Sequence, residues 1–212
     1  MNARPANVDP QPAEVGRRPA HRPSRVDEVV QAGIRVFARE GLAGATMAEV
    51  AEECGMGPGA LYYHFSTKEQ LFAACVRSVA ADIANVTGHG GAPPGSLPEV
   101  VRLLYDWYAA CPEKARLFFL AAPGSTPEIA QTCAEFVEEH VRDLSRYVNG
   151  AGGPPARRGS PVSDLAARTA IGTANAAAMS WLAGDLFGKR AGRATVADAV
   201  GRVMLRLLPE SP

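Results

Sequence analysis

Residues 46–72, TMAEVAEECGMGPGALYYHFSTKEQLF, decide the fold of this 212-residue chain. Thr46 is followed three positions later by Glu49. This spacing predicts a capping box, in which the threonine oxygen accepts from a free helix N–H and the glutamate reaches back to another. Apolar side chains then recur at i, i+3, i+4 and i+7, the spacing of one face of a short helix: Met47, Val50, Ala51 and Cys54.

A tight turn and a second short helix follow at once. Gly55 stands where the C-terminal cap of a helix favours a left-handed residue. Pro58 suits the first position of a new helix, where no N–H is needed, and Gly57 can serve as its N-cap. Leu61 and Phe65 are four positions apart and share the buried face. The segment therefore predicts a helix-turn-helix.

A third helix begins close behind. Ser66 and Glu69 have the spacing of another capping box, so this helix is expected to start at Thr67 or Lys68. It should run for about 20 residues, because apolar residues continue at helical spacing: Phe72, Cys75, Val79, Ile83 and Val86. Since it leads out of the helix-turn-helix, a motion of its C-terminal half would move that unit.

The outward face of the second short helix has the chemistry of a DNA-binding surface. Gly59 and Ala60 are small and lie near its N-terminus, which lets a helix enter the major groove with that end against the bases. Side chains that donate hydrogen bonds to phosphate oxygens follow: Tyr62, Tyr63, His64 and Lys68. Taken singly, the tyrosines could be half-buried core residues, and the histidine and lysine ordinary surface residues. Their combined spacing favours DNA contact.

The segment resembles the N-terminal domain of the TetR family of bacterial transcriptional regulators. The family pattern runs Thr, an aliphatic-Ala pair, a Gly-aliphatic turn, a Gly, Leu-Tyr-x-His-Phe, and Ser/Thr-Lys-Glu-x-Leu. This chain supplies Thr46, Val50-Ala51, Gly55-Met56, Gly59, Leu61-Tyr62-Tyr63-His64-Phe65 and Thr67-Lys68-Glu69-Gln70-Leu71. It departs from the pattern at Cys54, where Ala is usual, and at Gly57-Pro58, where a hydroxyl that can contact DNA is usual.

The resemblance implies roles for individual residues. Five are expected to contact phosphates: Thr46, Tyr62, Tyr63, His64 and Lys68. Gly59 and Ala60 are expected to lie closest to the bases, and Gly57 and Pro58 complete the predicted DNA-binding set.

Composition limits the class of protein. The chain has 22 basic and 22 acidic residues, which argues against bulk nonspecific binding of nucleic acid, so DNA affinity must come from locally placed donors. No apolar run reaches membrane-spanning length. The cysteines lack metal-like spacing and suit structural thiols in a reducing compartment: Cys54, Cys75, Cys111 and Cys133. We expect a cytoplasmic protein with no membrane segment, cofactor or metal.

The predicted organisation is all-α, with about nine helices in two folded domains. Residues 1–22, rich in Pro, Ala and Arg, are expected to be a disordered arm, which either reaches a minor groove or is a solvated tail. Residues 23–72 form the helix-turn-helix domain, with a first helix from about Ser24 to Arg39. Residues 73–212 form a bundle for ligand binding and dimerisation, with helices near 97–111, 113–122, 126–149, 163–186 and 194–208.

The last two helices, within residues 163–208, are expected to form a homodimer interface. The first is crowded with small residues: Ala166, Ala167, Ala170, Gly172, Ala174, Ala176, Ala177, Ala178 and Gly184. The second presents Val196, Val200, Val203, Met204 and Leu207. The resemblance implies that these helices from two subunits make a four-helix interface, although they could instead pack within one subunit. A dimer also suits a palindromic operator.

The resemblance also implies an inducer pocket in the C-terminal domain. The candidates are aromatic or sulfur-containing: Tyr105, Trp107, Tyr108, Cys111, Phe118, Phe119, Phe136, Met179 and Trp181. Such a pocket suits an apolar or aromatic ligand, and ordinary core packing is the alternative.

The sequence thus predicts a ligand-responsive regulator, a repressor released from a palindromic operator by a small molecule. Two alternatives come from other classes: a ligand-binding helical protein that has lost DNA binding, and an all-α enzyme. The enzyme is disfavoured, because the sequence has no paired carboxylates in an apolar setting, no nucleophile motif and no Gly-rich phosphate loop.

Overall fold

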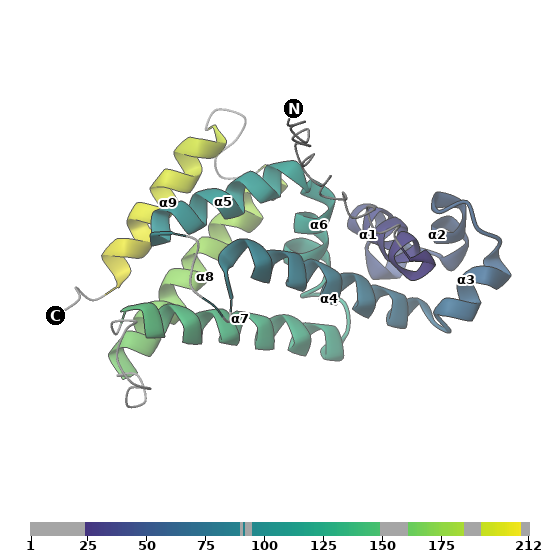
Figure 1. The fold of residues 1–212 in the computed structure, drawn as a ribbon, viewed down its shortest axis with the longest axis horizontal. Coiled ribbons are helices and arrows are strands. Elements are labelled where there is room, and N and C mark those ends of the chain that lie inside the picture. The colour runs from purple at the N-terminus through teal and green to yellow at the C-terminus, as the bar shows by residue number, and fades with distance from the viewer. Residues whose placement is uncertain (1–23, 90, 92–94, 149–160, 185–191, 209–212) are drawn as a thin grey trace, which may run out of the picture.

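The computed structural model describes residues 24–89, 91, 95–148, 161–184 and 192–208 (Figure 1). Within these ranges every regular element is helical, which confirms the predicted all-α class. The predicted arm, residues 1–22, lies outside the described residues. The elements are α1 (Arg25–Gly44), α2 (Met47–Glu53), α3 (Pro58–His64), α4 (Lys68–Thr87), α5 (Leu97–Ala110), α6 (Pro112–Arg116), the π-helix η1 (Leu117–Ala121), α7 (Pro127–Val148), α8 (Pro161–Ala183) and α9 (Arg193–Leu207).

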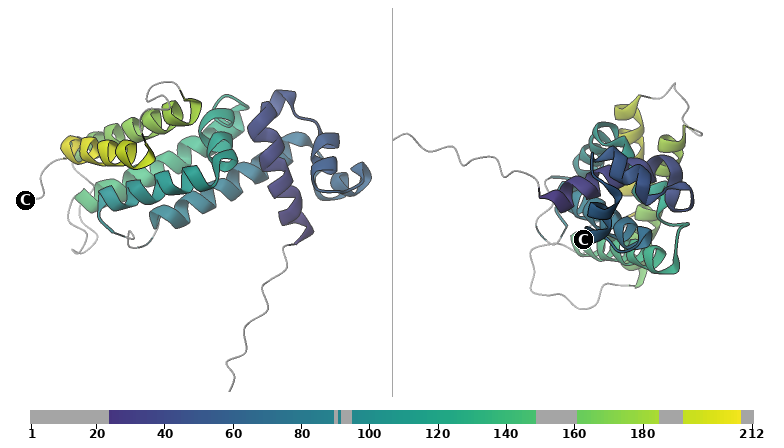
Figure 2. Two further views of the ribbon diagram at one scale, coloured as in Figure 1. Left: turned by 90° about the horizontal axis from the view of Figure 1, so that it is seen from above. Right: turned by 90° about the vertical axis from the view of Figure 1, so that its right-hand side faces the viewer.

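The molecule is elongated, with α1–α3 at one end and α9 toward the other (Figure 1, Figure 2). We call α1–α3 and the start of α4 the head, and α5–α9 the body. In the body α5 packs along α9, and α7 packs along α8. Helix α4 joins the two parts, because it contacts α1 as well as α5 and α7. The head also rests directly on the body, since α1 contacts α6 and η1.

The head core forms where α1 and α4 cross closely. A Cβ atom at Gly33 would lie 2.8 Å from the Cys75 sulfur, so only glycine permits this approach. The Cys75 thiol donates to the Val30 carbonyl at 3.4 Å, and burial raises the pKa of this thiol. Phe37 and Phe72 meet edge to face beside it, with ring centroids 4.9 Å apart. Cys75 therefore serves in packing, as predicted.

Helix α1 is interrupted at Gly41, where φ is +67°. The sequence predicts that the first helix ends at about Arg39, and the helical backbone breaks two residues later. One further turn follows the break, so α1 extends to Gly44. Glycine is needed at this position because other residues rarely adopt a positive φ.

The predicted cap of α4 is wrong by one residue. The N-cap is Thr67, whose side chain accepts from the Gln70 N–H at 3.1 Å. Gln70 reaches back to accept from the Ser66 N–H at 3.2 Å. The sequence offers two overlapping pairs with capping-box spacing, and the Thr–Gln pair forms in place of Ser66 and Glu69. The helix still begins at Lys68, as expected.

The body differs from the sequence expectation at two places. Residues Leu117–Ala121 form a π-helix, in which the Ala122 N–H donates to the Leu117 carbonyl at 2.9 Å. The prediction for α9 is wrong in part, because three of its five apolar residues are buried within the subunit: Val196, Val200 and Met204. They pack there because α9 lies along α5. None of the helices described is long and apolar enough to cross a membrane.

Candidate DNA-binding surface and ligand cavity

Helix α3 is held on the head by one buried side chain and a closed turn. Leu61 is fully buried, whereas its neighbours on α3 point away from the protein. In the turn before α3, Gly55 has φ +65°, and the Met56 N–H donates to the Ala51 carbonyl at 2.8 Å. This geometry matches the predicted left-handed cap after α2. The turn fixes the orientation of α3 relative to α2.

The outward face of α3 is open. Tyr63 is 87% exposed and Tyr62 is 52% exposed. Gly57, Pro58, Gly59 and Ala60 are all exposed, and a Cβ atom added at either glycine would meet nothing within 4 Å. His64 is half-buried, with its ring 5.4 Å from that of Tyr63. The structure therefore places six of the nine predicted DNA-binding residues on α3 and a seventh, Gly57, at its N-cap.

The other two predicted residues, Thr46 and Lys68, are already engaged inside the head. The Thr46 hydroxyl donates to Glu49 Oε2 at 2.8 Å and accepts from the Glu49 N–H at 3.2 Å. The hydrogen bond from the Thr46 hydroxyl, together with one from the Thr46 N–H at 2.7 Å, holds the pKa of the Glu49 carboxyl below its ordinary value. Lys68 Nζ donates to the Ala45 carbonyl at 2.9 Å. The lysine keeps two further donors for a phosphate, whereas the only hydrogen of the threonine hydroxyl is committed.

The body contains a cavity of about 250 Å³ between α4, α5, η1, α7 and α8. Five of the nine predicted ligand-binding residues line it: Tyr105, Tyr108, Phe118, Phe119 and Phe136. The other four do not: Trp107, Cys111, Met179 and Trp181. Of the neighbours Trp107 and Tyr108 on α5, only Tyr108 lines the cavity. On η1, both Phe118 and Phe119 line it. Aliphatic side chains are the commonest of the remaining lining residues, which suits an apolar ligand.

Aromatic rings form a continuous series along the cavity, and all of them except the last, Trp181, line it. Neighbouring ring centroids lie 4.2 to 5.7 Å apart, within the range of favourable aromatic contact. One end of the series is a stacked pair of imidazoles, and the other is a pair of tyrosines beside an indole. In order, the rings are His89, His140, Phe136, Phe118, Phe119, Tyr108, Tyr105 and Trp181.

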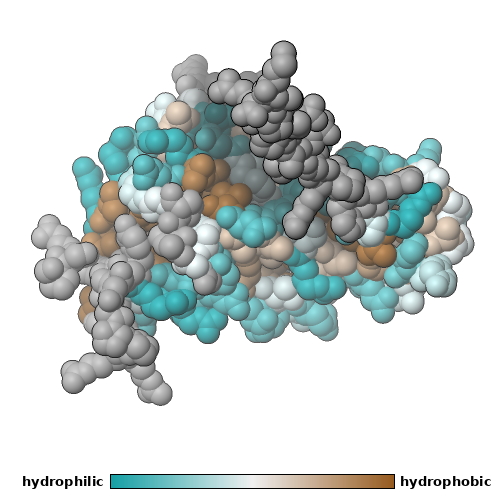
Figure 3. Space-filling view, viewed as in Figure 1, coloured by the Kyte–Doolittle hydropathy of each residue, from teal (hydrophilic) through white to brown (hydrophobic). Residues whose placement is uncertain are grey.

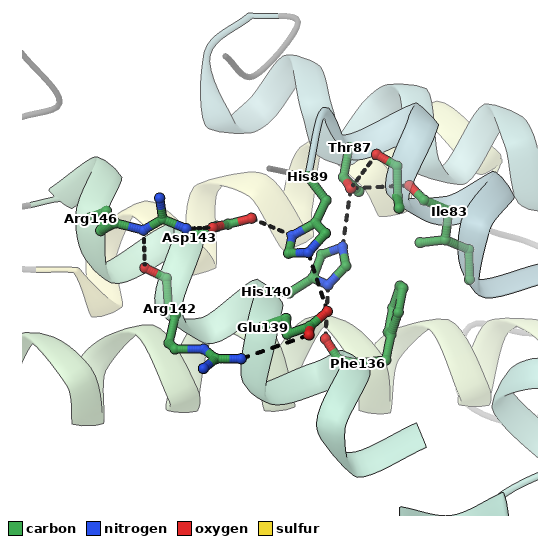
Figure 4. Close-up of polar contacts among 10 residues, drawn as sticks. Ile83, Thr87, His89, Phe136, Glu139, His140, Arg142, Asp143 and Arg146 are labelled. Carbon is green, nitrogen blue, oxygen red and sulfur yellow. Dashed lines mark hydrogen bonds and ion pairs between the residues drawn. The ribbon is translucent and has the colours of Figure 1, made fainter. Parts of the chain in front are cut away.

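The imidazole end carries a polar cluster that the sequence did not indicate (Figure 4). His89 faces two carboxylates: its Nδ1 bonds to Asp143 and its Nε2 lies 3.2 Å from Glu139. His140 Nε2 lies 3.1 Å from the Thr87 hydroxyl. Arg146, one turn beyond Asp143, pairs with it. The described residues contain no group of three ligating side chains that could hold a metal ion.

This polar cluster combines residues of α7 with a histidine from just beyond the end of α4, so the sequence alone does not reveal it. Asp143 lies four positions after Glu139 and three after His140, and Arg146 lies three positions after Asp143. This spacing, which is visible in the sequence, places the four side chains toward one side of α7. His89 lies just beyond α4, after the left-handed Gly88. It reaches α7 only because α4 and α7 pack together, and no local pattern indicates that contact.

Burial controls the titration of the cavity groups. It lowers the pKa of His140, and the hydrogen bond from its Nδ1 to the Phe136 carbonyl opposes the shift. Burial also raises the pKa of Tyr105 to about 12 and that of Tyr108 well above its ordinary value. Both phenols are therefore neutral at physiological pH.

A second surface runs along α8. Its exposed residues recur at alternating steps of three and four, the spacing of a helix–helix seam: Val162, Leu165, Thr169, Gly172, Ala176, Met179 and Ala183. On α9, Val203 and Leu207 are exposed as well. Apolar side chains also come to the surface over α5 and α9 in the space-filling view (Figure 3).

Known proteins resemble this chain in part of its sequence and in its fold. Residues 29–75 match the model of the bacterial regulatory proteins of the tetR family. The HTH-type transcriptional repressor AcnR of Corynebacterium diphtheriae is 37% identical over 91 residues, which are 40% of this chain and 45% of that protein. The chain therefore matches less than half the length of this curated relative.

Solved structures extend the likeness to the body. A TetR-like transcriptional regulator from Rhodococcus sp. RHA1 has a TM-score of 0.68 at 16% identity, over 87% of this chain and 97% of that one. FadR from Bacillus subtilis, in complex with stearoyl-CoA, has a TM-score of 0.66 at 16% identity, over 86% and 98% of the two chains. At such low identities these matches show the fold alone.

Proposed function

We propose that the chain is a dimeric transcriptional repressor of the TetR family of bacterial regulatory proteins, and that a small ligand releases it from its operator. The observation that carries the proposal is the outward face of α3. Buried Leu61 anchors this helix, while Gly59 and Ala60 leave its N-terminal end open for the major groove. Tyr62 and Tyr63 place two exposed hydroxyls where they can donate to phosphates.

Homodimerisation through α8 and α9 is part of the proposal. A seam of small and apolar residues along α8, from Val162 to Ala183, is exposed to solvent in the single subunit. Small residues such as Gly172 and Ala176 allow a second α8 to approach closely. Two recognition helices held by such a seam would read the two halves of a palindromic operator.

The effector site in the proposal is the aromatic cavity. The cavity is lined by α4, which joins head and body, and by η1, which contacts α1 of the head. A ligand that favours one arrangement of these elements would change the spacing of the two heads in the dimer. Ligand and operator must then weaken each other's binding by the same factor.

Fluorescence anisotropy of the full chain with labelled duplexes tests the proposal. Duplexes enriched from a random library should bind tightly and selectively, and their affinity should fall as salt rises. Tyr63→Ala should weaken binding to every sequence, whereas Ala60→Ser should alter the preferred sequence. If the random library yields no enriched sequence and no duplex binds, the protein is instead a ligand-binding member of the fold that does not read DNA.

A further inference from the structure

The hydroxyl of Tyr105 is buried without a hydrogen-bond partner. It is the one such side-chain group found among the described residues, and Tyr105 as a whole is only 1% exposed. Buried polar groups in native proteins nearly always have a hydrogen-bond partner, and a buried group without a partner destabilises the fold. Tyr105 also lines the ligand cavity, so an occupant could supply the missing partner.

We propose that the cavity takes a small uncharged molecule with an aromatic body, and that a carbonyl or ether oxygen of this molecule accepts a hydrogen bond from the Tyr105 hydroxyl. This inference rests on the proposed function, whose effector site it specifies. The acceptor belongs to the ligand because a neutral phenol has one hydrogen to donate, and nothing in the described residues receives it.

The surroundings of Tyr105 argue against a charged group at this position. Its ring neighbours are Tyr108 and Trp181, with centroids 5.2 and 5.7 Å away. The charged residues of the lining gather at the other end of the ring series, where Asp143 pairs with His89 and Arg146. An ionised ligand group beside Tyr105 would lose its hydration without gaining an opposite charge.

The cavity volume limits the size of the ligand. At about 250 Å³ the space lies at the low end of ligand pockets, so one or two fused rings fit better than a long acyl chain. The ring series that lines the cavity supplies edges and faces for contact with an aromatic body.

Calorimetric titration with three matched probes tests the assignment. 2-Acetylnaphthalene has the aromatic body and a neutral acceptor, 2-isopropenylnaphthalene has nearly the same shape without the acceptor, and 2-naphthoate carries a charge. The full-length protein should prefer the ketone to the alkene by about five-fold, the worth of one net hydrogen bond. It should bind the carboxylate more weakly than the ketone.

Tyr105→Phe provides the matched variant, because it removes only the oxygen. In this variant the ketone and the alkene should bind equally, and the affinity for the alkene should stay at its wild-type value. Without any probe, the melting temperature of the variant should equal or exceed that of the wild type. A lower melting temperature would mean that the hydroxyl has a partner in the empty protein and would overturn the proposal.

Three binding results would also overturn it: no ketone binding by the wild type up to the solubility limit, an undiminished ketone preference in Tyr105→Phe, or tighter binding of the carboxylate. DNA anisotropy on the same samples, without probe, separates this inference from the proposed function. Ketone binding through Tyr105 in a protein that binds no DNA would refute the repressor and support the ligand site. Operator binding without ketone binding would refute the ligand site alone.

Discussion

The side chains proposed to bind DNA point out of the head, whereas those proposed to bind the ligand point into the core of the body. Tyr63 is almost fully exposed, and its removal would leave the packing of Leu61 beneath it intact. Phe118 and Phe119 are buried, and they shape the cavity while also holding η1 in the core. Binding and stability are therefore separable in the head and coupled in the body, and substitutions can test this difference.

The largest expected effect is the loss of the head core in Phe37→Ala. Phe37 is fully buried against Phe72, so truncation should cost about 3–5 kcal/mol of unfolding free energy. DNA binding should disappear with the fold of the head. Urea unfolding followed by circular dichroism measures the change.

Phe136→Ala is the matched truncation in the body. Phe136 is only half-buried and borders space that is already empty, so its loss should cost roughly half as much as Phe37→Ala. Equal costs for the two variants would mean that the cavity is collapsed in solution.

The next largest effect is expected from Leu165→Glu on the α8 seam. A carboxylate there would be buried in a dimer but solvated in a monomer, so it should dissociate the subunits. A single head loses the gain of bivalent binding, and operator affinity should fall about 100-fold. Sedimentation velocity and anisotropy give the two readouts, with Ala109→Glu on the exposed side of α5 as the control. A monomeric variant with undiminished affinity would contradict the proposed geometry.

The head could be predicted from its sequence because its hydrogen bonds are local. The capping box of Thr46 and Glu49, the left-handed Gly55 and the proline at the start of α3 all involve residues a few positions apart. Where two local signals overlapped, at Ser66 and Thr67, the sequence alone did not decide between them.

For the cavity, the sequence predicts the kinds of residue that line it but not which individual residues do so. The sequence singled out the aromatic residues of the body, but which of them line the cavity depends on how α5, η1 and α7 pack. Trp107 and Tyr108 are neighbours in sequence and face different surroundings. The contact between Thr87 and His140 joins residues 53 positions apart and has no local signature.

A smaller effect is expected from Tyr63→Ala on the head surface. The loss of one phosphate donor should weaken operator binding about ten-fold for every sequence. The unfolding free energy should change by less than about 0.5 kcal/mol, because the side chain is exposed. Anisotropy and urea unfolding on the same preparation test both statements. A large loss of stability would mean that the ring packs on the head, and that binding and stability are coupled there too.

The smallest effect is a pH dependence of stability that arises in the cavity and has no counterpart on α3. Burial lowers the pKa of His140 below its ordinary value of 6.5, so the unfolded chain binds a proton more readily than the folded one. Stability should therefore be complete above about pH 6.5 and should fall as the pH drops below this value. The groups that face His140 are Thr87, His89 and the Phe136 carbonyl, and the nearby carboxylates of Asp143 and Glu139 oppose the lowering of its pKa. Carboxyls with lowered pKa, such as Glu99 and Glu138, affect stability only at more acidic pH.

Urea unfolding at pH 7.5, 6.5 and 5.5 tests this prediction. The unfolding free energy should fall less steeply with pH for His140→Gln than for the wild type, because the variant has no ring to protonate. A steeper decline would mean that the folded protein holds His140 as a cation and that its partners, rather than burial, dominate its titration.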